Sequence, residues 1–321
     1  MTTHMGRILF SLAILTFLIG IPYLVLSDYL LYLIILSGIY FIAVSGLNLI
    51  SGYVGKLSLG HAAFFGIGAY AAAILSLKWQ APFWLGLLAA GLIPTVLTLP
   101  IGYVSLKLRG PYFVIVTLAF AEIARMVIKN WVSLTGGPMG LPGIPSGKLS
   151  LWGRTIHFTD STYYYLVLAL GLLTFYIVRK LAGSRIGRAW VAIREDEDRA
   201  LALGINSRIY ALQALCWGSF FAGVAGGVYA YYIGLIAPEI VAFYYMITML
   251  VMLILGGAGT AEGPIIGAII FTVLPEMLRI AEHYRLPILG GILMLAVIFF
   301  PAGLRPLLAR LPEILKERKI L

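Results

Sequence analysis

The chain has 321 residues, of which 61% are hydrophobic and 11% charged, with a formal net charge of +10. The charged fraction is roughly half that of an average soluble domain, which argues against an ordinary soluble enzyme. The cations lie at the ends of apolar segments, where they fix orientation and meet anionic headgroups, so the charge does not indicate nucleic-acid binding. The single cysteine, Cys216, excludes a disulfide framework or a cysteine metal cluster within the chain.

Apolar runs of about 20 residues recur along the whole chain, and each is long enough to cross a hydrocarbon core as a helix. Backbone groups cannot stay unpaired in lipid, and no alternating barrel pattern is present. We therefore predict an all-α, polytopic integral membrane protein with about ten transmembrane helices, forming one domain over residues 1–321. Eight or nine spans remain possible if one apolar segment is re-entrant. The predicted spans are 8–26, 29–50, 57–77, 83–105, 111–130, 161–179, 207–232, 241–260, 264–281 and 287–308.

The longest polar interruption, residues 179–208, sets the orientation of these spans. It carries seven Arg or Lys residues, so the positive-inside rule places it in the cytoplasm together with both termini. Sixteen Lys or Arg then fall on the cytoplasmic side and five on the other. The Gly- and Pro-rich segment 131–160 becomes an outer loop. The basic, amphipathic tail 309–321 is predicted to form a cytoplasmic membrane-surface helix.

Two glycine-rich stretches, 52–68 and 256–267, have a patterned spacing. Small residues in membranes permit close helix contact, and they also allow a helix to break where it lines a cavity. The stretches resemble each other loosely, which indicates internal duplication, although tight packing explains the pattern equally well.

Nucleotide and metal chemistry leave no signature in the sequence. The pairs Gly55-Lys56 and Gly147-Lys148 are both followed by Leu and lack the upstream glycine of a phosphate-binding loop. No His, Cys and carboxylate grouping has metal-ligand spacing, and no nucleophile–base pattern is present. We predict no catalytic residue, metal site or bound cofactor, so any ATP hydrolysis belongs to a separate polypeptide.

The polar loop contains a possible contact site for such a polypeptide. Asp198, Arg199 and Ala200 followed by Gly204 fit the spacing of the Glu-Ala-Ala-x3-Gly loop of ATP-driven importers, although the later Ile-x-Leu-Pro part is absent. We predict one short helix over Ala189–Leu203 that docks on an ATPase. Its predicted apolar contacts are Trp190, Ile193, Leu201 and Leu203. The alternative is a solvated loop that only sets topology.

Span 111–130 contains Glu122, Arg125 and Lys129, whose spacing places them on one helix face. Ionisable groups at membrane depth usually face the protein interior or a water path. The alternative is a structural ion pair with Lys129 reaching the interface. His61, after Gly60, is either a pathway residue or a packing residue. The tentative pathway residues are thus Gly60, His61, Glu122 and Arg125.

Several motifs occur in the same order as in a known family. They are GYVGKLSLGHAAFFGIGAYAAAIL (52–75), RGPYFVIVTLAFAEIARM (109–126), TGGPMGLPGIP (135–145), GRAWVAIREDEDRALALGIN (187–206), VMLILGGAGTAEGPIIGA (251–268) and FFPAGL (299–304). Together they resemble the membrane subunit of branched-chain amino acid ABC importers, the LivM type.

The resemblance implies a permease in a bacterial inner membrane, acting with a homologous LivH-type permease, two ATPase subunits that use ATP and Mg, and a periplasmic binding protein. Leu, Ile and Val are the favoured solutes; similar permeases carry urea, short amides or other neutral amino acids. The cytoplasmic coupling loop carries over onto residues 180–206, and the 131–160 loop becomes a periplasmic docking face. Its coupling residues are Arg188, Arg194, Glu195, Asp196, Asp198, Arg199, Ala200 and Gly204. An ion-coupled secondary transporter, which would use Glu122 with Arg125, and a non-transporting scaffold are the alternatives from other classes.

Overall fold

The computed structural model describes residues 27–108, 110–151 and 154–277, together with positions 18, 20–22, 291 and 294. The side chains of 148–157, 276 and 277 are outside this description. Within it, six helical segments are long and apolar enough to cross a membrane. They are α2 (Asp28–Leu47) continued by the π-helix η1 (Asn48–Tyr53), α3 (His61–Trp79), α4 (Phe83–Ser105), α5 (Pro111–Asn130), α7 (Asp160–Gly183) and α10 (Ser207–Ile233).

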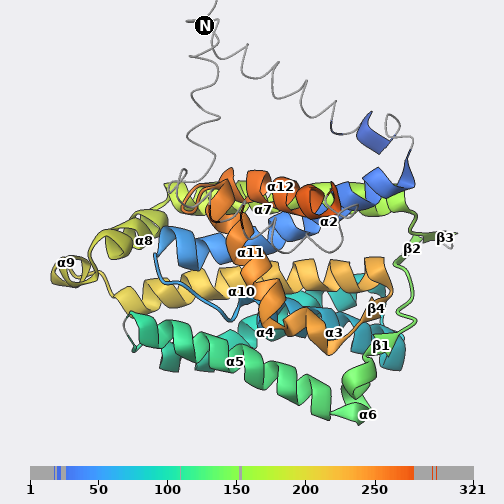
Figure 1. Cartoon of the computed structure of the whole chain (residues 1–321), viewed down its shortest axis with the longest axis horizontal. Helices are drawn as coiled ribbons and strands as arrows, with labels where there is room; N and C mark the ends of the chain where they lie inside the picture. Colours follow the sequence, from blue (N-terminus) through green and yellow to red (C-terminus); the bar gives the residue numbers. More distant parts are fainter. Residues whose placement is uncertain are drawn as a thin grey trace, which may run out of the picture.

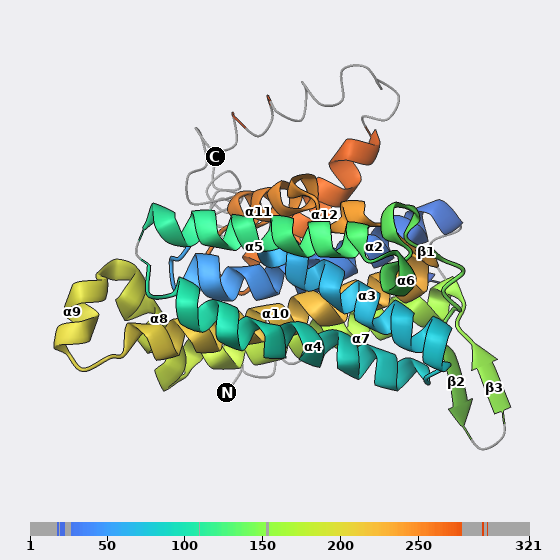
Figure 2. The same cartoon turned by 90° about the horizontal axis from the view of Figure 1, so that it is seen from below.

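Helix α10 lies at the centre of the bundle and packs against α2, α3 and α4 (Figure 2). Its small residues permit this close approach. A methyl group on Gly226 would overlap the carbonyl of Phe65 in α3, and one on Gly223 would overlap the carbonyl of Ala90 in α4. Helices α4, α5 and α7 lie at the periphery, with many exposed side chains.

The two polar segments lie at opposite ends of the long helices (Figure 1). At one end are α8 (Arg185–Glu195) and α9 (Glu197–Ala202). At the other end the predicted loop 131–160 folds into short elements: α6 (Val132–Thr135), the 3-10 turn η2 (Gly137–Met139) and strands β1 (Leu141–Pro142), β2 (Lys148–Leu151) and β3 (Arg154–His157). β2 pairs antiparallel with β3, and β1 pairs antiparallel with β4 (Leu235–Ile236), aligning Leu141 with Ile236.

The helix α2 does not continue directly into α3. After η1, residues 54–60 are not helical, and α3 begins at His61, four residues later than the predicted start at 57. Side chains supply hydrogen-bond partners for part of this non-helical backbone. Leu59 N donates to Thr117 Oγ1 (3.0 Å), and Ser58 N donates to Ser51 Oγ (3.2 Å). Such pairing is what a membrane environment demands of a broken helix.

Two further apolar helices are α11 (Phe243–Gly256) and α12 (Gly263–Met277). α11 is shorter than the predicted span 241–260, whereas the end of the predicted span 264–281 lies outside the described residues. The turn 257–262 connects α11 to α12, and the two helices pack against each other. The 3-10 turn η3 (Pro238–Val241) precedes α11, and Gly257, at a φ of 117°, ends it. The helix α11 therefore occupies only Phe243–Gly256 of the predicted 241–260 span. Most of the predicted spans 8–26 and 287–308 lies outside the described residues.

Candidate coupling site

The helices α8 and α9 owe their start points to capping side chains. Ser184 Oγ accepts hydrogen bonds from the backbone N–H groups of Ile186 and Gly187, at 3.1 and 3.4 Å. Asp196 Oδ1 accepts from the N–H groups of Asp198 and Arg199, at 3.1 and 3.0 Å. Because Asp196 has an extended backbone and caps a new helix, the single helix predicted over Ala189–Leu203 is wrong: two helices meet at this residue.

The inner face of α8 is anchored in the chain's own core. Trp190 is fully buried, and its Nε1 donates to the carbonyl of Tyr210 at the start of α10 (2.8 Å). Ile193 is also buried, and so is Ala200 of α9. Of the four predicted apolar contacts, two are therefore buried within this chain and two are exposed. Trp190 and Ile193 hold α8 to this chain, whereas Leu201 and Leu203 are exposed, at 41% and 80%.

Arg194 extends from the end of α8 to the glycine-rich parts of two other segments. Its Nη1 donates to the carbonyl of Gly52 in η1 (3.2 Å), and its aliphatic carbons lie against Gly55. A methyl group on Gly259 would come within 2.6 Å of Arg194 Nη1. Its Nη2 also pairs with Glu195 Oε1 (3.0 Å). One side chain thus contacts both η1 and the 257–262 turn.

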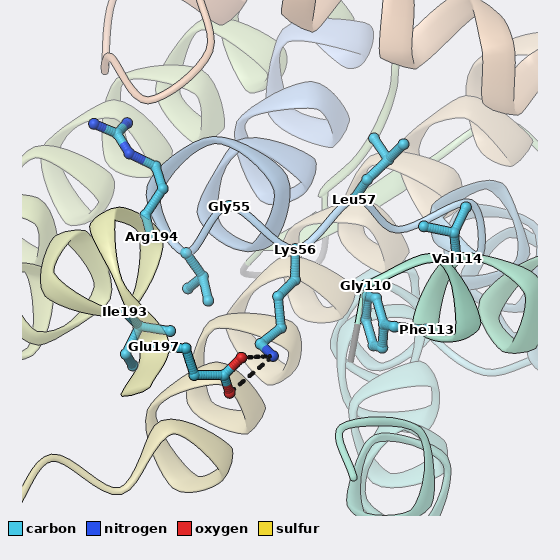
Figure 3. Close-up of a pocket in the computed structure, with 10 residues that line it drawn as sticks. Gly55, Lys56, Leu57, Gly110, Phe113, Val114, Ile193, Arg194 and Glu197 are labelled. Carbon is cyan, nitrogen blue, oxygen red and sulfur yellow. Dashed lines mark hydrogen bonds and ion pairs between the residues drawn. The ribbon is translucent and has the colours of Figure 1, made fainter. Parts of the chain in front are cut away.

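A second link joins α9 to the non-helical segment 54–60. Lys56 Nζ lies 3.0 and 2.9 Å from the two carboxylate oxygens of Glu197 (Figure 3). The side chains are only 12% and 23% exposed. This ion pair borders a cavity of about 320 Å³, whose far wall is the start of α5 at Gly110, Phe113 and Val114.

The two glycine-rich stretches meet at Asn48, a fully buried residue in η1. Its Nδ2 donates to the carbonyl of Thr260 (2.7 Å), and its Oδ1 accepts from the N–H of Gly259 (2.8 Å). A methyl group on Gly52 would overlap both Asn48 Oδ1 and Gly259 N. The close approach therefore requires glycine at position 52 and an amide at position 48.

The other predicted coupling residues lie toward the outside of α8 and α9. Arg188, Asp198 and Arg199 are exposed, and Arg199 Nε pairs with Asp196 Oδ2 (2.8 Å). Gly204, at a φ of 81°, follows α9 in the left-handed region that favours glycine.

The predicted pathway residues do not form one site. His61 is fully buried, with Nε2 2.9 Å from the carbonyl of Ala43, and Gly60 packs on the carbonyl of Thr117. Glu122 and Arg125 instead form an ion pair on α5, with side chains 43% and 33% exposed. Lys56, Glu197 and Asn48 were not predicted as site residues. Asn48 could have been found from the sequence, because it is an amide side chain within an apolar run. The Lys56–Glu197 pair could not, because its residues are 141 positions apart in the sequence.

The helix arrangement defines a multi-pass membrane protein. The sequence matches the family described as "Branched-chain amino acid transport system / permease component" over residues 29–301. The high-affinity branched-chain amino acid transport system permease protein LivM of Escherichia coli K12 is 34% identical, covering 93% of this chain and 75% of that protein. The chain therefore belongs to this permease family, whose members are transport subunits rather than enzymes.

Two further relatives place the chain within the family. The probable branched-chain amino acid transport permease protein LivM of Methanocaldococcus jannaschii is 25% identical, covering 87% of this chain and 94% of that protein. The LivH permease protein of Salmonella typhimurium is 27% identical, covering 84% of this chain and 92% of that protein. No solved structure matches the chain.

Proposed function

We propose that this chain is one of two permeases in an ATP-binding-cassette importer for Leu, Ile and Val in a bacterial inner membrane. The second permease is LivH-like, two ATPase subunits use ATP and Mg, and a periplasmic protein delivers the solute. The similarity of the chain to both LivM and LivH proteins supports a pair of homologous permeases. In this proposal the α8–α9 end faces the cytoplasm, as its excess of cations favours.

One observation supports the coupling part of this proposal: one face of α8 and α9 packs on this chain, and the opposite face is exposed. Their inner face is fixed to η1, to the 54–60 segment and to α10 through Arg194, Lys56–Glu197 and Trp190. Their outer face exposes apolar Val191, Leu201 and Leu203 beside charged residues. A soluble ATPase bound to the outer face could therefore displace α8 and α9 together with η1, the 54–60 segment and the start of α10.

The coupling surface is tested by exchanging outward side chains. Leu201→Ser together with Leu203→Ser should abolish retention of the ATPase subunits in a pull-down from detergent. Val132→Ser is the matched control, because Val132 is exposed at the opposite end of the molecule. Undiminished ATPase retention by the double variant would reject this surface.

The transport function is tested by reconstitution of the chain with the second permease, the ATPases and the binding protein. Proteoliposomes should accumulate Leu only with hydrolysable ATP, and Ile and Val should compete. Uptake driven by an ion gradient without the ATPases would reject the proposal. Competition by urea or short amides, but not by Ile or Val, would assign a different solute.

A further inference from the structure

The outward faces of the peripheral helices differ in chemistry. Along α4 the exposed residues are apolar through the middle of the helix: Leu88, Leu92, Val96 and Leu99. Along α7 the exposed central residues Leu172, Leu173 and Tyr176 show the same pattern. Such faces suit hydrocarbon.

Helix α5 departs from this pattern near its centre. Its inner face, Phe113, Thr117, Ala121 and Ile128, is buried. Its outward stripe follows helical spacing through Tyr112, Ile115, Ala119, Ile123 and Met126. The Glu122–Arg125 ion pair lies within this stripe, in the second half of a 20-residue helix, with Glu122 just past its midpoint.

This pair is poorly suited to lipid. Arg125 Nε lies 3.1 and 3.0 Å from the two carboxylate oxygens of Glu122, but both side chains remain a third or more exposed. A charged side chain at the bilayer centre costs about 3 kcal/mol or more, and pairing within one helix leaves the outer atoms uncovered. Protein or water therefore has to cover this face in the membrane.

The turn η3 adds a second observation at the same place. Glu239 is exposed and interacts electrostatically with Arg125, and η3 packs against both α3 and α5. Gly66 of α3, which contacts Val241 of η3, is 13 residues before the Trp79 end of that helix. This separation is roughly 20 Å along the helix. The irregular backbone of η3 thus lies deep in the bundle, and such backbone is tolerated where it is buried in protein or lines water.

We propose that the α5 polar face, defined as Ala119, Glu122, Arg125, Met126 and Glu239, packs against the second permease and lines a water-filled route for the zwitterionic solute. This inference rests on the proposed function. A homologous partner would present a corresponding helix, so two like faces meet about a pseudo-twofold axis. The face offers a guanidinium for a carboxylate and two carboxylates for an ammonium group.

The experiment measures water access in the complex of both permeases and the ATPases, in lipid vesicles. In a Cys216→Ser background, single variants Ala119→Cys and Met126→Cys probe the α5 polar face. Leu92→Cys and Leu99→Cys on α4 are matched controls, being 46% and 48% exposed and apolar in surroundings. Each thiol is treated with a charged, water-soluble maleimide, and a parallel spin-labelled sample is tested for collision with oxygen.

The α5 thiols should react about tenfold faster than the α4 thiols, since the reactive thiolate forms in water. Their spin labels should collide less with lipid-dissolved oxygen, and either α5 thiol should cross-link to the second permease. Equal, lipid-like behaviour at both helices, or cross-linking through α4 instead, would overturn the inference. Uptake of Leu by the unmodified complex is measured first, so a complex without uptake counts against the proposed function, while the labelling pattern still decides the α5 face.

Discussion

The ion pair between Lys56 and Glu197 tests whether α9 transmits force to the 54–60 segment. The perturbation is charge reversal: Lys56→Glu, Glu197→Lys and the double variant that exchanges the two charges. Each single variant places like charges where the structure has contacts of 2.9 and 3.0 Å. The double variant restores an attractive pair with opposite polarity.

The magnitude follows from the burial of the pair. Two unit charges 4 Å apart interact by about 4 kcal/mol at an effective dielectric constant of about 20. Because the side chains are 12% and 23% exposed, solvent screening and desolvation reduce the net effect to about 2 kcal/mol. This free energy is about a 30-fold change in the equilibrium between attached and detached α9.

The assay is the number of Leu molecules taken up per ATP hydrolysed in proteoliposomes. Each single reversal should lower this ratio on the order of tenfold while ATP hydrolysis continues, and the exchanged pair should recover most of it. Two outcomes would refute the reasoning. One is an unchanged ratio in both single variants; the other is a double variant as impaired as the sum of the singles, with normal amounts in the membrane.

Two further changes test the packing of the same region. Trp190→Ala removes a fully buried indole and its hydrogen bond to Tyr210. This variant should destabilise the docking of α8 by about 3–5 kcal/mol and speed trypsin cleavage in α8. The control Val191→Ala, at an exposed position, should change stability by less than about 0.5 kcal/mol. Gly52→Ala places a methyl group against Asn48 and Gly259 and should abolish Leu uptake, whereas Gly183→Ala, with open space around it, should leave uptake normal. Trypsin resistance of the Trp190 variant, or normal uptake by the Gly52 variant, would contradict these assignments.

Hydropathy located the long helices closely. The spans predicted at 83–105 and 111–130 coincide with α4 and α5, because Pro82 and Gly110 mark where the chain turns. The same signal overestimated the length of α11. An apolar run shows that a segment avoids water, but it does not show where the helix begins and ends: α11 begins only after the 3-10 turn η3 and ends at Gly256.

The position of the polar loop that we propose as the coupling region was predictable, but its internal structure was not. Its cluster of cations marked the loop, but the predicted helix over Ala189–Leu203 ran through Asp196, although Asp196 also fits the pattern of a helix cap. Trp190 and Ile193 were assigned to a partner because amphipathicity shows only that one face is apolar, not which protein covers it. The partners of Arg194 and Lys56 depend on tertiary packing between segments more than a hundred residues apart.

Asn48 provides a test of whether η1 and the 257–262 turn move as one unit. Asn48→Ala leaves the N–H of Gly259 and the carbonyl of Thr260 without the partners that the structure gives them at 2.8 and 2.7 Å. Each unpaired buried group costs about 1–3 kcal/mol, so the turn should separate from η1 more often.

Hydrogen exchange of the Gly259 amide should accelerate on the order of tenfold or more, because exchange requires this hydrogen bond to open. Ser37→Ala is the matched control, since Ser37 is buried in α2 and its hydroxyl donates only locally, to the carbonyl of Leu33 at 2.7 Å. Peptides covering 251–268 report the exchange by mass spectrometry. Unchanged exchange in the Asn48 variant, or equal acceleration in the Ser37 control, would contradict this prediction. Helix packing alone would then hold the turn, and the Asn48 hydrogen bonds would not couple it to η1.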